Sequence, residues 1–309
     1  MLLSGIHHIT VLASDAQRNA DFYTDFLGLR MVKRTVNFDA PDVYHLYYAD
    51  AQGSPGTLMT FFPFPNAGGG KRGNGEVSAV AWHVPSSSLD YWVTRLASKA
   101  VSFDGPSTRF GQQVVSLLDP DGMKIDLVFS EKPPTVVAWS RGPVPEEHQL
   151  HTFHGVTMAL RDTVPSLALL SNVMGFRPAG TEAARQRFTV GNGAAMAYID
   201  LVVNPSLPWA RPSAGSVHHI AWRVRDDAEQ IAWRDRLRAA DVNVTDIVDR
   251  QYFHSIYYRE PGGILYEIAT DSPGMNVDEE WQVLGEKLQL PPWYEPHRAR
   301  IESALPALR

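Results

Sequence analysis

Short runs of β-branched and aromatic residues, each bounded by glycine or proline, recur along the chain. Clear examples are residues 215–224 and 260–269, and a similar run opens the chain at 5–11. Runs of this kind are typical of strands. Amphipathic helical patterns lie between them, and the one over 20–27 ends at Gly28, where glycine suits the left-handed C-cap of a helix. The chain therefore alternates short strands with short helices.

The same order of elements repeats when the chain is compared with itself, at offsets between 140 and 147 residues. The matching segments are 80–84 with 220–224, 119–122 with 260–263, 26–29 with 173–176, and 7–10 with 154–157. A repeat of this length marks copies of one structural unit. We expect four modules, near residues 5–65, 76–130, 152–204 and 215–271.

Each module begins with a strand and a helix and ends in strands, the last of which follows a Pro-Asp-Gly or Pro-Gly-Gly turn. The sequence therefore predicts an α+β fold of four βαβββ modules in two tandem halves. We expect an N-terminal half at 1–132, a linker at 133–151, a C-terminal half at 152–275 and a helical tail at 276–309. Within the tail, Asp278 is expected to cap a helix, and a last short helix should follow Pro291 and Pro292.

Composition excludes several classes of function. The formal charge of −6 and the pI of about 6.0 give no field that would attract nucleic acid. The chain contains no run of 18 apolar residues, which argues against a membrane span. We expect a cytoplasmic protein, and a homo-oligomer is compatible with the sequence. Cysteine is absent, so any metal must take histidine and carboxylate ligands.

Three residues are out of place as members of buried strands: His8, His219 and Glu267. If they converge, two imidazoles and one carboxylate form the ligand set that leaves open positions on a non-haem Fe(II). The repeat places Gly155, Ala79 and Asp126 at the corresponding positions of the other two modules. Those residues cannot complete a second site, so we expect one metal per chain and a locally paired Asp126.

Several motifs together resemble the vicinal-oxygen-chelate (glyoxalase-like) superfamily, and within it the ring-cleaving dioxygenases that open para-hydroquinones. The motifs lie at residues 7–10, 218–219, 249–258, 260–267 and 290–298. The resemblance spans essentially the whole chain and implies two glyoxalase/extradiol-dioxygenase-like halves. It also implies Fe(II) as the cofactor, with Mn(II) as the alternative, and a small aromatic substrate and O2 as partners.

Carried over residue by residue, the resemblance implies that His8, His219 and Glu267 bind the metal. It places five further residues around the substrate: His7, Thr10, His218, Arg250 and Tyr257. Strict strand alternation puts Thr10 on the face of His8 but turns His7 and His218 to the opposite face. Arg250 could instead pair with Asp246 or Asp249, and Tyr257 could be a packing residue.

Two other functions stay open. A metal-dependent lyase or isomerase of the glyoxalase kind would use the metal without redox chemistry, but such sites usually recruit a second carboxylate. A protein that sequesters an aromatic ligand would have no reason to keep the three ligands together. The remaining histidines carry no metal motif: the spacing of His148, His151 and His154 fits neither face of a strand, and we interpret His45, His83, His254 and His297 as surface or packing residues.

Overall fold

The computed structural model describes residues 2–65, 67–68 and 70–309 and contains the four expected modules. The first comprises β1 (Ile6–Ala13), α1 (Ala16–Asp21) with the π-helical turn η1 (Phe22–Phe26), β2 (Arg30–Asn37), β3 (Ala40–Ala49) and β4 (Leu58–Pro63). The second comprises β5 (Glu76–Pro85), η2 (Ser86–Ser88), α2 (Leu89–Ser98), β6 (Phe103–Arg109), β7 (Gln112–Leu118) and β8 (Lys124–Ser130).

The second half repeats this order. After the 3-10 turn η3 (Glu146–His148), the third module comprises β9 (Phe153–Leu160), α3 (Val164–Leu167), η4 (Ala168–Val173), β10 (Arg177–Glu182), β11 (Arg185–Val190), η5 (Gly193–Ala195) and β12 (Ala197–Val203). The fourth comprises β13 (Val217–Val224), α4 (Asp227–Ala239), β14 (Val248–Asp249), β15 (Phe253–Arg259) and β16 (Leu265–Pro273). The prediction of an α+β fold with βαβββ modules is confirmed.

Gly28 ends the first helical segment as the sequence predicts. Its φ of 79° lies in the left-handed region, and a Cβ at this position would lie 2.5 Å from a methyl group of Val144. At the other end of the segment, the Asp15 side chain accepts a hydrogen bond from the Arg18 backbone N–H. Local capping therefore fixes both ends of the helix that joins β1 to β2.

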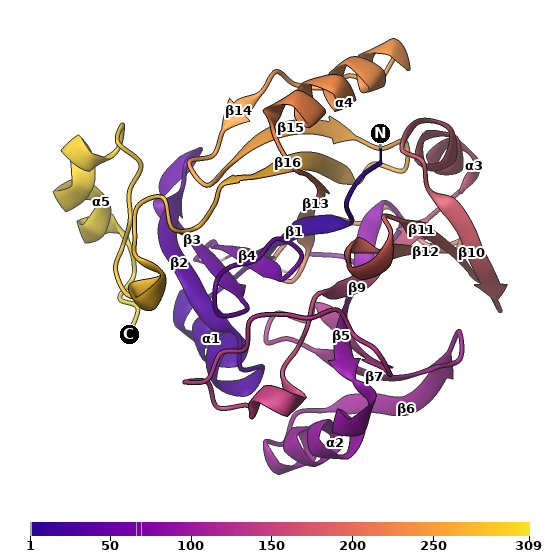
Figure 1. Ribbon diagram of the computed structural model, residues 1–309, viewed down its shortest axis with the longest axis horizontal. Coiled ribbons are helices and arrows are strands. Elements are labelled where there is room, and N and C mark those ends of the chain that lie inside the picture. Colours follow the sequence, from indigo (N-terminus) through magenta and orange to yellow (C-terminus); the bar gives the residue numbers. More distant parts are fainter. Residues whose placement is uncertain (1, 66, 69) are drawn as a thin grey trace.

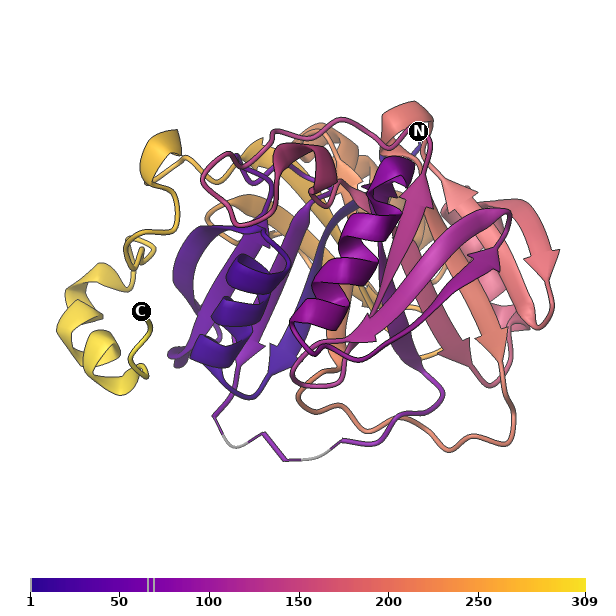
Figure 2. The ribbon, with the colours of Figure 1, turned by 90° about the horizontal axis from the view of Figure 1, so that it is seen from below.

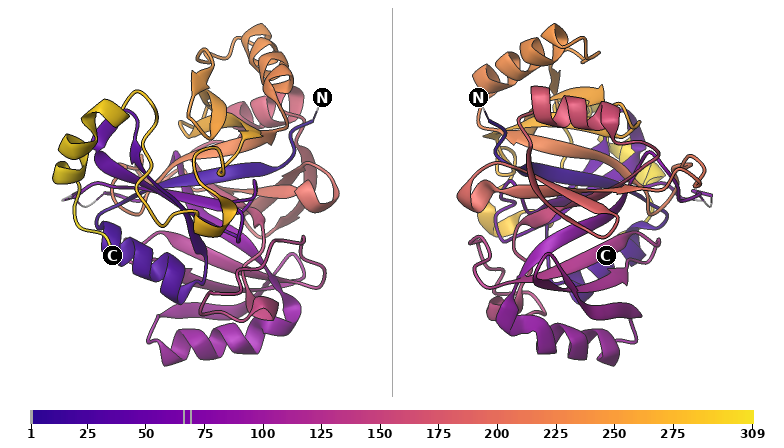
Figure 3. Two further views of the ribbon diagram at one scale, coloured as in Figure 1. Left: turned by 60° about the vertical axis from the view of Figure 1, so that its left-hand side comes forward. Right: turned by 90° about the vertical axis from the view of Figure 1, so that its right-hand side faces the viewer.

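The modules combine into two eight-stranded sheets, and each sheet takes one module from each half (Figure 3). Strand order is β14-β15-β16-β13-β1-β4-β3-β2 in one sheet and β10-β11-β12-β9-β5-β8-β7-β6 in the other. The first and fourth modules join through antiparallel β1 and β13, and the second and third through antiparallel β5 and β9. The division of the sequence at residues 132 and 152 stays a prediction.

The helices lie on the outside of the sheets, with α4 and α2 at opposite ends of the molecule in Figure 1. Figure 2 shows α1 and α2 in front of the strands of their own modules. One large hydrophobic cluster joins both sheets and their helices, and it contains four fully buried tryptophans: Trp82 on β5, Trp222 on β13, Trp92 on α2 and Trp233 on α4. No helix in the described part of the chain is long and apolar enough to cross a membrane.

The C-terminal tail lies beside β2 and β3 (Figure 1). It contains the short 3-10 turns η6 (Trp281–Val283) and η7 (Glu295–His297), and then α5 (Arg298–Ala304). The prediction of a helix capped by Asp278 is wrong. The Asp278 carboxylate instead accepts hydrogen bonds from Lys33 Nζ and from the Tyr252 hydroxyl, so a buried lysine, and not a helix terminus, determines its position. The last short helix, α5, is confirmed.

Because β1 and β13 belong to different halves, separate halves should not bind a metal at the site that these strands form. We expect a fragment of residues 1–132 and a fragment of residues 143–309 each to bind less than a tenth of the metal bound by the intact chain. Metal content per purified chain measures this. Co-expression of the two fragments is the control, since pairing of β1 with β13 should restore the site. One metal per chain in either isolated fragment would contradict the prediction.

Candidate metal centre and aromatic pocket

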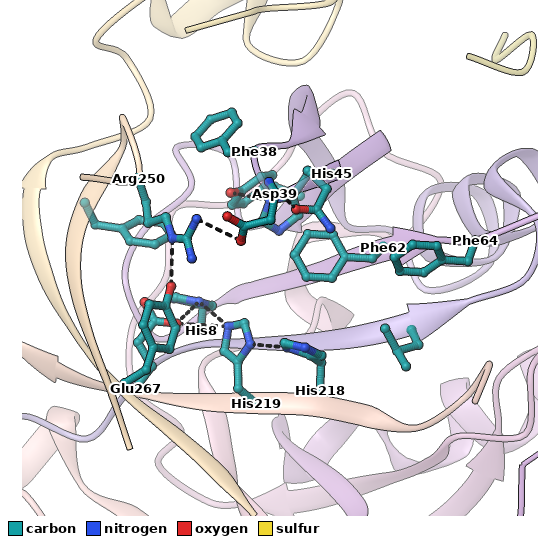
Figure 4. A pocket seen from close by; sticks show the side chains of 15 residues that line it. His8, Phe38, Asp39, His45, Phe62, Phe64, His218, His219, Arg250 and Glu267 are labelled. Carbon is teal, nitrogen blue, oxygen red and sulfur yellow. Dashed lines mark hydrogen bonds and ion pairs between the residues drawn. The ribbon is translucent and has the colours of Figure 1, made fainter. Parts of the chain in front are cut away.

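Three buried side chains converge at the middle of the first sheet: His8, His219 and Glu267. His8 Nε2 lies 3.2 Å from His219 Nε2, and Glu267 Oε2 lies 3.0 Å from His219 Nε2 and 3.4 Å from His8 Nε2. Among the described residues, this is the group whose potential ligand atoms all lie within 4.8 Å of one another. Figure 4 shows the three side chains at the base of a pocket.

Adjacent strands supply the three groups. β13 and β16 are parallel neighbours with Ala221 opposite Glu267, and β1 and β13 are antiparallel with Thr10 opposite His219. Two β-bulges interrupt the second pairing, one on each strand, and His7 and His218 are the extra residues. A bulge breaks strand alternation and redirects a side chain. Strict alternation therefore does not hold here: His218 lines the pocket beside His219, whereas His7 does not line it and contacts His8.

Each bulge histidine contacts the metal-ligand candidate that follows it. His7 Nδ1 lies 2.9 Å from His8 Nδ1, and His218 Nδ1 lies 2.7 Å from His219 Nδ1. The Ser255 hydroxyl donates a hydrogen bond to Glu267 Oε1. Contacts of this kind orient metal ligands and set the tautomer of a histidine. Sequence reasoning missed Ser255, for which the chain carries no motif.

His7 is a neutral partner for His8. Burial, with His8 nearby, holds the pKa of His7 well below its usual value, so the ring is neutral. The two Nδ1 atoms lie 2.9 Å apart, and in such a contact one ring donates and the other accepts. The tautomer of His8 that carries its proton on Nδ1 presents the lone pair of Nε2 to the centre.

The charge on Glu267 fits a cation at the same place. Burial alone would raise its pKa, but His8 and His219 hold the pKa of Glu267 well below its usual value. The carboxylate is fully buried, and among the described residues Oε2 has no hydrogen-bond donor. A buried anionic oxygen without a donor is costly unless a cation binds it. One carboxylate oxygen and two imidazole nitrogens are a suitable donor set for a divalent transition metal.

The pocket above these groups combines an aromatic wall with a polar end (Figure 4). The apolar lining consists of Leu12, Phe38, Phe62, Phe64 and Phe253. The polar lining, besides the three ligand candidates, consists of Asn37, Asp39, His45, Tyr47, His218, Arg250 and Tyr257. A site of this composition can hold a flat ring by its faces and orient its polar substituents.

Arg250 and Tyr257 form one hydrogen-bonded unit at the pocket wall. Arg250 Nε donates to the Tyr257 hydroxyl oxygen over 3.0 Å, and Arg250 Nη1 donates to Asp39 Oδ2 over 3.2 Å. Burial raises the pKa of Tyr257 well above its usual value, so the hydroxyl keeps its proton. Because its oxygen already accepts from Arg250, that proton is available to a ligand. Neither Asp246 nor Asp249 forms an ion pair with Arg250 among the described residues.

The structure places the sequence-predicted residues in two groups. His8, His218, His219, Arg250, Tyr257 and Glu267 line the pocket. His7 and Thr10 lie behind it, fully buried, and contact His8 and His219 respectively. The interpretation of His45 as a surface or packing residue is wrong, since His45 lines the pocket with Tyr47 beside it. A lone histidine on β3 gave no pattern that could have revealed this role.

Five of the other histidines have hydrogen-bond partners away from the pocket. His83 contacts Ser130, His254 contacts Asp227, and His148 contacts Ser88. His151 Nδ1 donates to the Pro134 carbonyl, and His154 contacts Gln112. His297 is exposed in η7.

Ion pairs occupy the corresponding position of the second sheet. Arg109 Nη1 donates to Asp126 Oδ2, and Ser116 Oγ donates to Asp126 Oδ1, each over 2.5 Å. The expectation of a locally paired Asp126 is confirmed. At the place of His8, a Cβ on Gly155 would lie 2.2 Å from the Tyr198 carbonyl oxygen, so no side chain fits there without a backbone shift.

Comparison with known proteins agrees with the repeated architecture. The family described as the Glyoxalase/Bleomycin resistance protein/Dioxygenase superfamily matches residues 5–127 and again residues 152–268. MhqO of Bacillus subtilis (strain 168), named as a ring-cleaving dioxygenase, is 41% identical over 97% of this chain and 95% of its own length. The chlorohydroquinone/hydroquinone 1,2-dioxygenase of Sphingobium indicum is 35% identical over 95% of this chain and 93% of its own.

Solved structures show the same likeness. A Bacillus subtilis protein named as a dioxygenase superposes with a TM-score of 0.95 at 40% identity, covering 100% of this chain and 98% of its own. Glyoxalase I from Zea mays superposes with a TM-score of 0.63 at 12% identity, covering 87% of this chain and 92% of its own, and so shares the fold alone. The chain belongs to the Glyoxalase/Bleomycin resistance protein/Dioxygenase superfamily, and its full-length relatives are enzymes named as ring-cleaving dioxygenases.

Proposed function

We propose that this chain is an Fe(II)-dependent ring-cleaving dioxygenase that inserts both atoms of O2 into a hydroquinone- or catechol-type ring, with Mn(II) as the alternative metal. His8, His219 and Glu267 are the proposed ligands. The observation that carries the proposal is the convergence of two imidazole nitrogens and one carboxylate oxygen at the base of an aromatic pocket. The name of the Sphingobium indicum relative supports hydroquinones as the substrate class.

Three protein ligands leave open positions on the metal, where an ionised phenolic oxygen and O2 can bind side by side. The aromatic wall holds the ring of the substrate and keeps water away from it. Phe62 stands between His218 and His45, with ring centroids 5.7 Å and 4.3 Å away. A ring bound next to Phe62 therefore has polar groups at both edges, which suits a substrate with hydroxyls at opposite ends.

The polar residues hold protons and charge around that ring. The Tyr257 hydroxyl donates to a substrate oxygen whose negative charge grows during the reaction. Arg250 fixes this hydroxyl and supplies positive charge to a polar substituent. His218 is exposed to the pocket and moves a proton to or from the ring oxygen. His7 and Thr10 act through the ligands that they contact.

The lyase or isomerase alternative has less support. The metal group contains one carboxylate among the described residues, whereas glyoxalase-type chemistry usually recruits a second. The likeness to the maize enzyme is one of fold. A cytoplasmic location and a homo-oligomer stay predictions.

Oxygen consumption tests the proposed reaction directly. Protein loaded anaerobically with Fe(II) should consume O2 in a one-to-one ratio with a hydroquinone or a catechol, and the loss of ring absorbance should follow oxygen uptake. The same protein without metal is the control. If the loaded protein consumed no oxygen with any member of a panel of both substrate types, the proposal would be wrong.

Replacement of a metal ligand should remove the metal. In His8→Ala, His219→Ala and Glu267→Ala, iron content should fall to a small fraction of the wild-type value and turnover should be lost, because two ligands do not hold Fe(II) tightly. His151→Ala is the control, since His151 contacts the Pro134 carbonyl away from the site. Circular dichroism checks folding. Normal iron in folded Glu267→Ala protein would overturn the ligand assignment.

Tyr257→Phe should separate catalysis from metal binding. The change removes one hydroxyl and little volume, so iron content and thermal stability should hold. Turnover should fall on the order of 10²-fold if the hydroxyl stabilises growing charge on the substrate. Tyr258→Phe is the matched control, because the Tyr258 hydroxyl contacts Met174 Sδ in the core. A Tyr257→Phe enzyme within a few-fold of wild type in both kcat and KM would show that Tyr257 is a packing residue.

A further inference from the structure

One ion pair spans the mouth of the aromatic pocket. Arg250 Nη1 lies 3.2 Å from Asp39 Oδ2, and both residues line the pocket. The Asp39 side chain is 76% exposed and that of Arg250 is 22% exposed, whereas His8, His219 and Glu267 are buried at the base. Figure 4 shows the pair above these three metal-ligand candidates. The pair therefore lies where the pocket opens to solvent.

The two partners come from opposite edges of the first sheet. Asp39 lies in the turn after β2, Arg250 follows β14, and these two strands are the edges of the sheet. The sheet therefore curls until its edges meet over the pocket. Asn37 Oδ1 accepts a hydrogen bond from the Asp39 backbone N–H, and the Tyr294 hydroxyl donates to the carbonyl of Phe38. These two contacts hold the turn that carries Asp39.

Stability gives little reason for a carboxylate at this place. An ion pair with one partner so exposed contributes little to the free energy of unfolding. The carboxylate instead sets the charge at the pocket mouth. Apart from histidines, the described residues that line the pocket include three with charged side chains, namely Asp39, Arg250 and Glu267. Because Glu267 belongs to the candidate metal centre, the mouth holds one positive and one negative group, which cancel.

A single ring bound at the base of the pocket reaches this pair. The pocket has a volume of about 210 Å³, which is below the roughly 300–1,000 Å³ of most ligand pockets. If one ring oxygen binds at the base, a substituent opposite that oxygen points to the mouth. Arg250 donates from Nε to Tyr257 and from Nη1 to Asp39, so Nη2 can donate to an uncharged polar substituent. An anionic substituent there would also meet the Asp39 carboxylate.

We propose that Asp39 is a specificity-determining residue, which makes the pocket prefer rings with uncharged substituents to rings with an anionic substituent opposite the metal-bound oxygen. This inference rests on the proposed metal centre and substrate class. The Asp39 carboxylate cancels the charge of Arg250, which would otherwise attract an anion, and it repels an anion directly. A hydroquinone meets neither obstacle, because its second oxygen is an uncharged hydroxyl.

Two ligands of similar shape test this preference without turnover. 4-Hydroxybenzenesulfonate carries an anionic group opposite its hydroxyl, and 4-(methylsulfonyl)phenol carries an uncharged group of similar size at the same place. Sulfonates and sulfones are weak metal ligands, so both compounds should bind the metal through the phenolic oxygen. Calorimetry measures the Kd of each compound for protein that is loaded with Fe(II) and kept free of oxygen.

The wild-type protein should bind the uncharged sulfone more tightly than the sulfonate. In Asp39→Asn, the ratio of the sulfonate Kd to the sulfone Kd should fall about tenfold, the size of one charge interaction across a partly exposed site. Asp39→Glu keeps the charge and should retain most of the wild-type preference. Thermal stability should hold in both variants, because the side chain is exposed.

Asp42→Asn is the matched control for the charge change. Asp42 is exposed near the start of β3 and does not line the pocket, so this variant removes the same charge from the neighbouring surface. The ratio of the two Kd values should stay at the wild-type value. A fall in Asp42→Asn as large as in Asp39→Asn would show a general effect of surface charge and would overturn the inference.

The wild-type ratio distinguishes this inference from its alternative, in which Arg250 binds an anionic substituent that displaces Asp39. Tighter binding of the sulfonate than of the sulfone by the wild-type protein would overturn the inference in favour of that alternative. An unchanged ratio in Asp39→Asn would overturn it as well. Both results would leave the proposed function standing, since phenols would still bind. A metal-loaded wild-type protein that binds neither compound would overturn the proposed substrate class and the inference together.

Discussion

The pairing of β1 with β13 is the constraint on which the site depends. It joins modules from the two halves of the sequence, and its two bulges place His7 and His218 against the Nδ1 atoms of His8 and His219. Glu267 then needs only the parallel pairing of β16 with β13 to reach both imidazoles. The pairing that joins the two halves of the sheet therefore also assembles the candidate metal centre, and a shift in the register of β1 against β13 would separate His8 from His219.

The two sheets bury their central carboxylates in different ways. The Asp126 carboxylate accepts hydrogen bonds from Arg109, which also neutralises its charge, and from Ser116. Glu267 accepts a hydrogen bond from Ser255 at one oxygen and has two imidazoles near the other, and in the described part of the chain neither a lysine nor an arginine forms an ion pair with it. Because a buried carboxylate must be compensated, the first arrangement is complete by itself, whereas the second is suited to a cation from outside. Corresponding places in the two sheets thus hold a carboxylate that the protein neutralises itself and a carboxylate that belongs to a candidate metal centre.

The sequence predicted the features that depend on repetition and pattern, namely the four modules, the helix end at Gly28 and the convergence of His8, His219 and Glu267. It could not predict features set by tertiary contacts. The faces of His7 and His218 depend on bulges that no local pattern marks. The side chain of Asp278 binds Lys33 and Tyr252, and this tertiary contact overrode the capping signal. The place of His45 in the pocket is set by the pairing of its strand with its neighbours, and a single histidine in the sequence does not reveal that pairing.

Residues far apart in the sequence also hold the pocket wall. The turn after β2 carries Phe38 and Asp39, which line the pocket. The Tyr294 hydroxyl donates to the Phe38 carbonyl over 2.8 Å, and Trp293 packs edge-on against the Phe38 ring. The tail itself is held by fully buried Lys33, whose Nζ lies 2.5 Å from both the Asp278 and Glu279 carboxylates. Since separation of a buried ion pair is costly, the tail is a fixed support behind the pocket wall, and the position of Phe38 depends on its contacts with the tail.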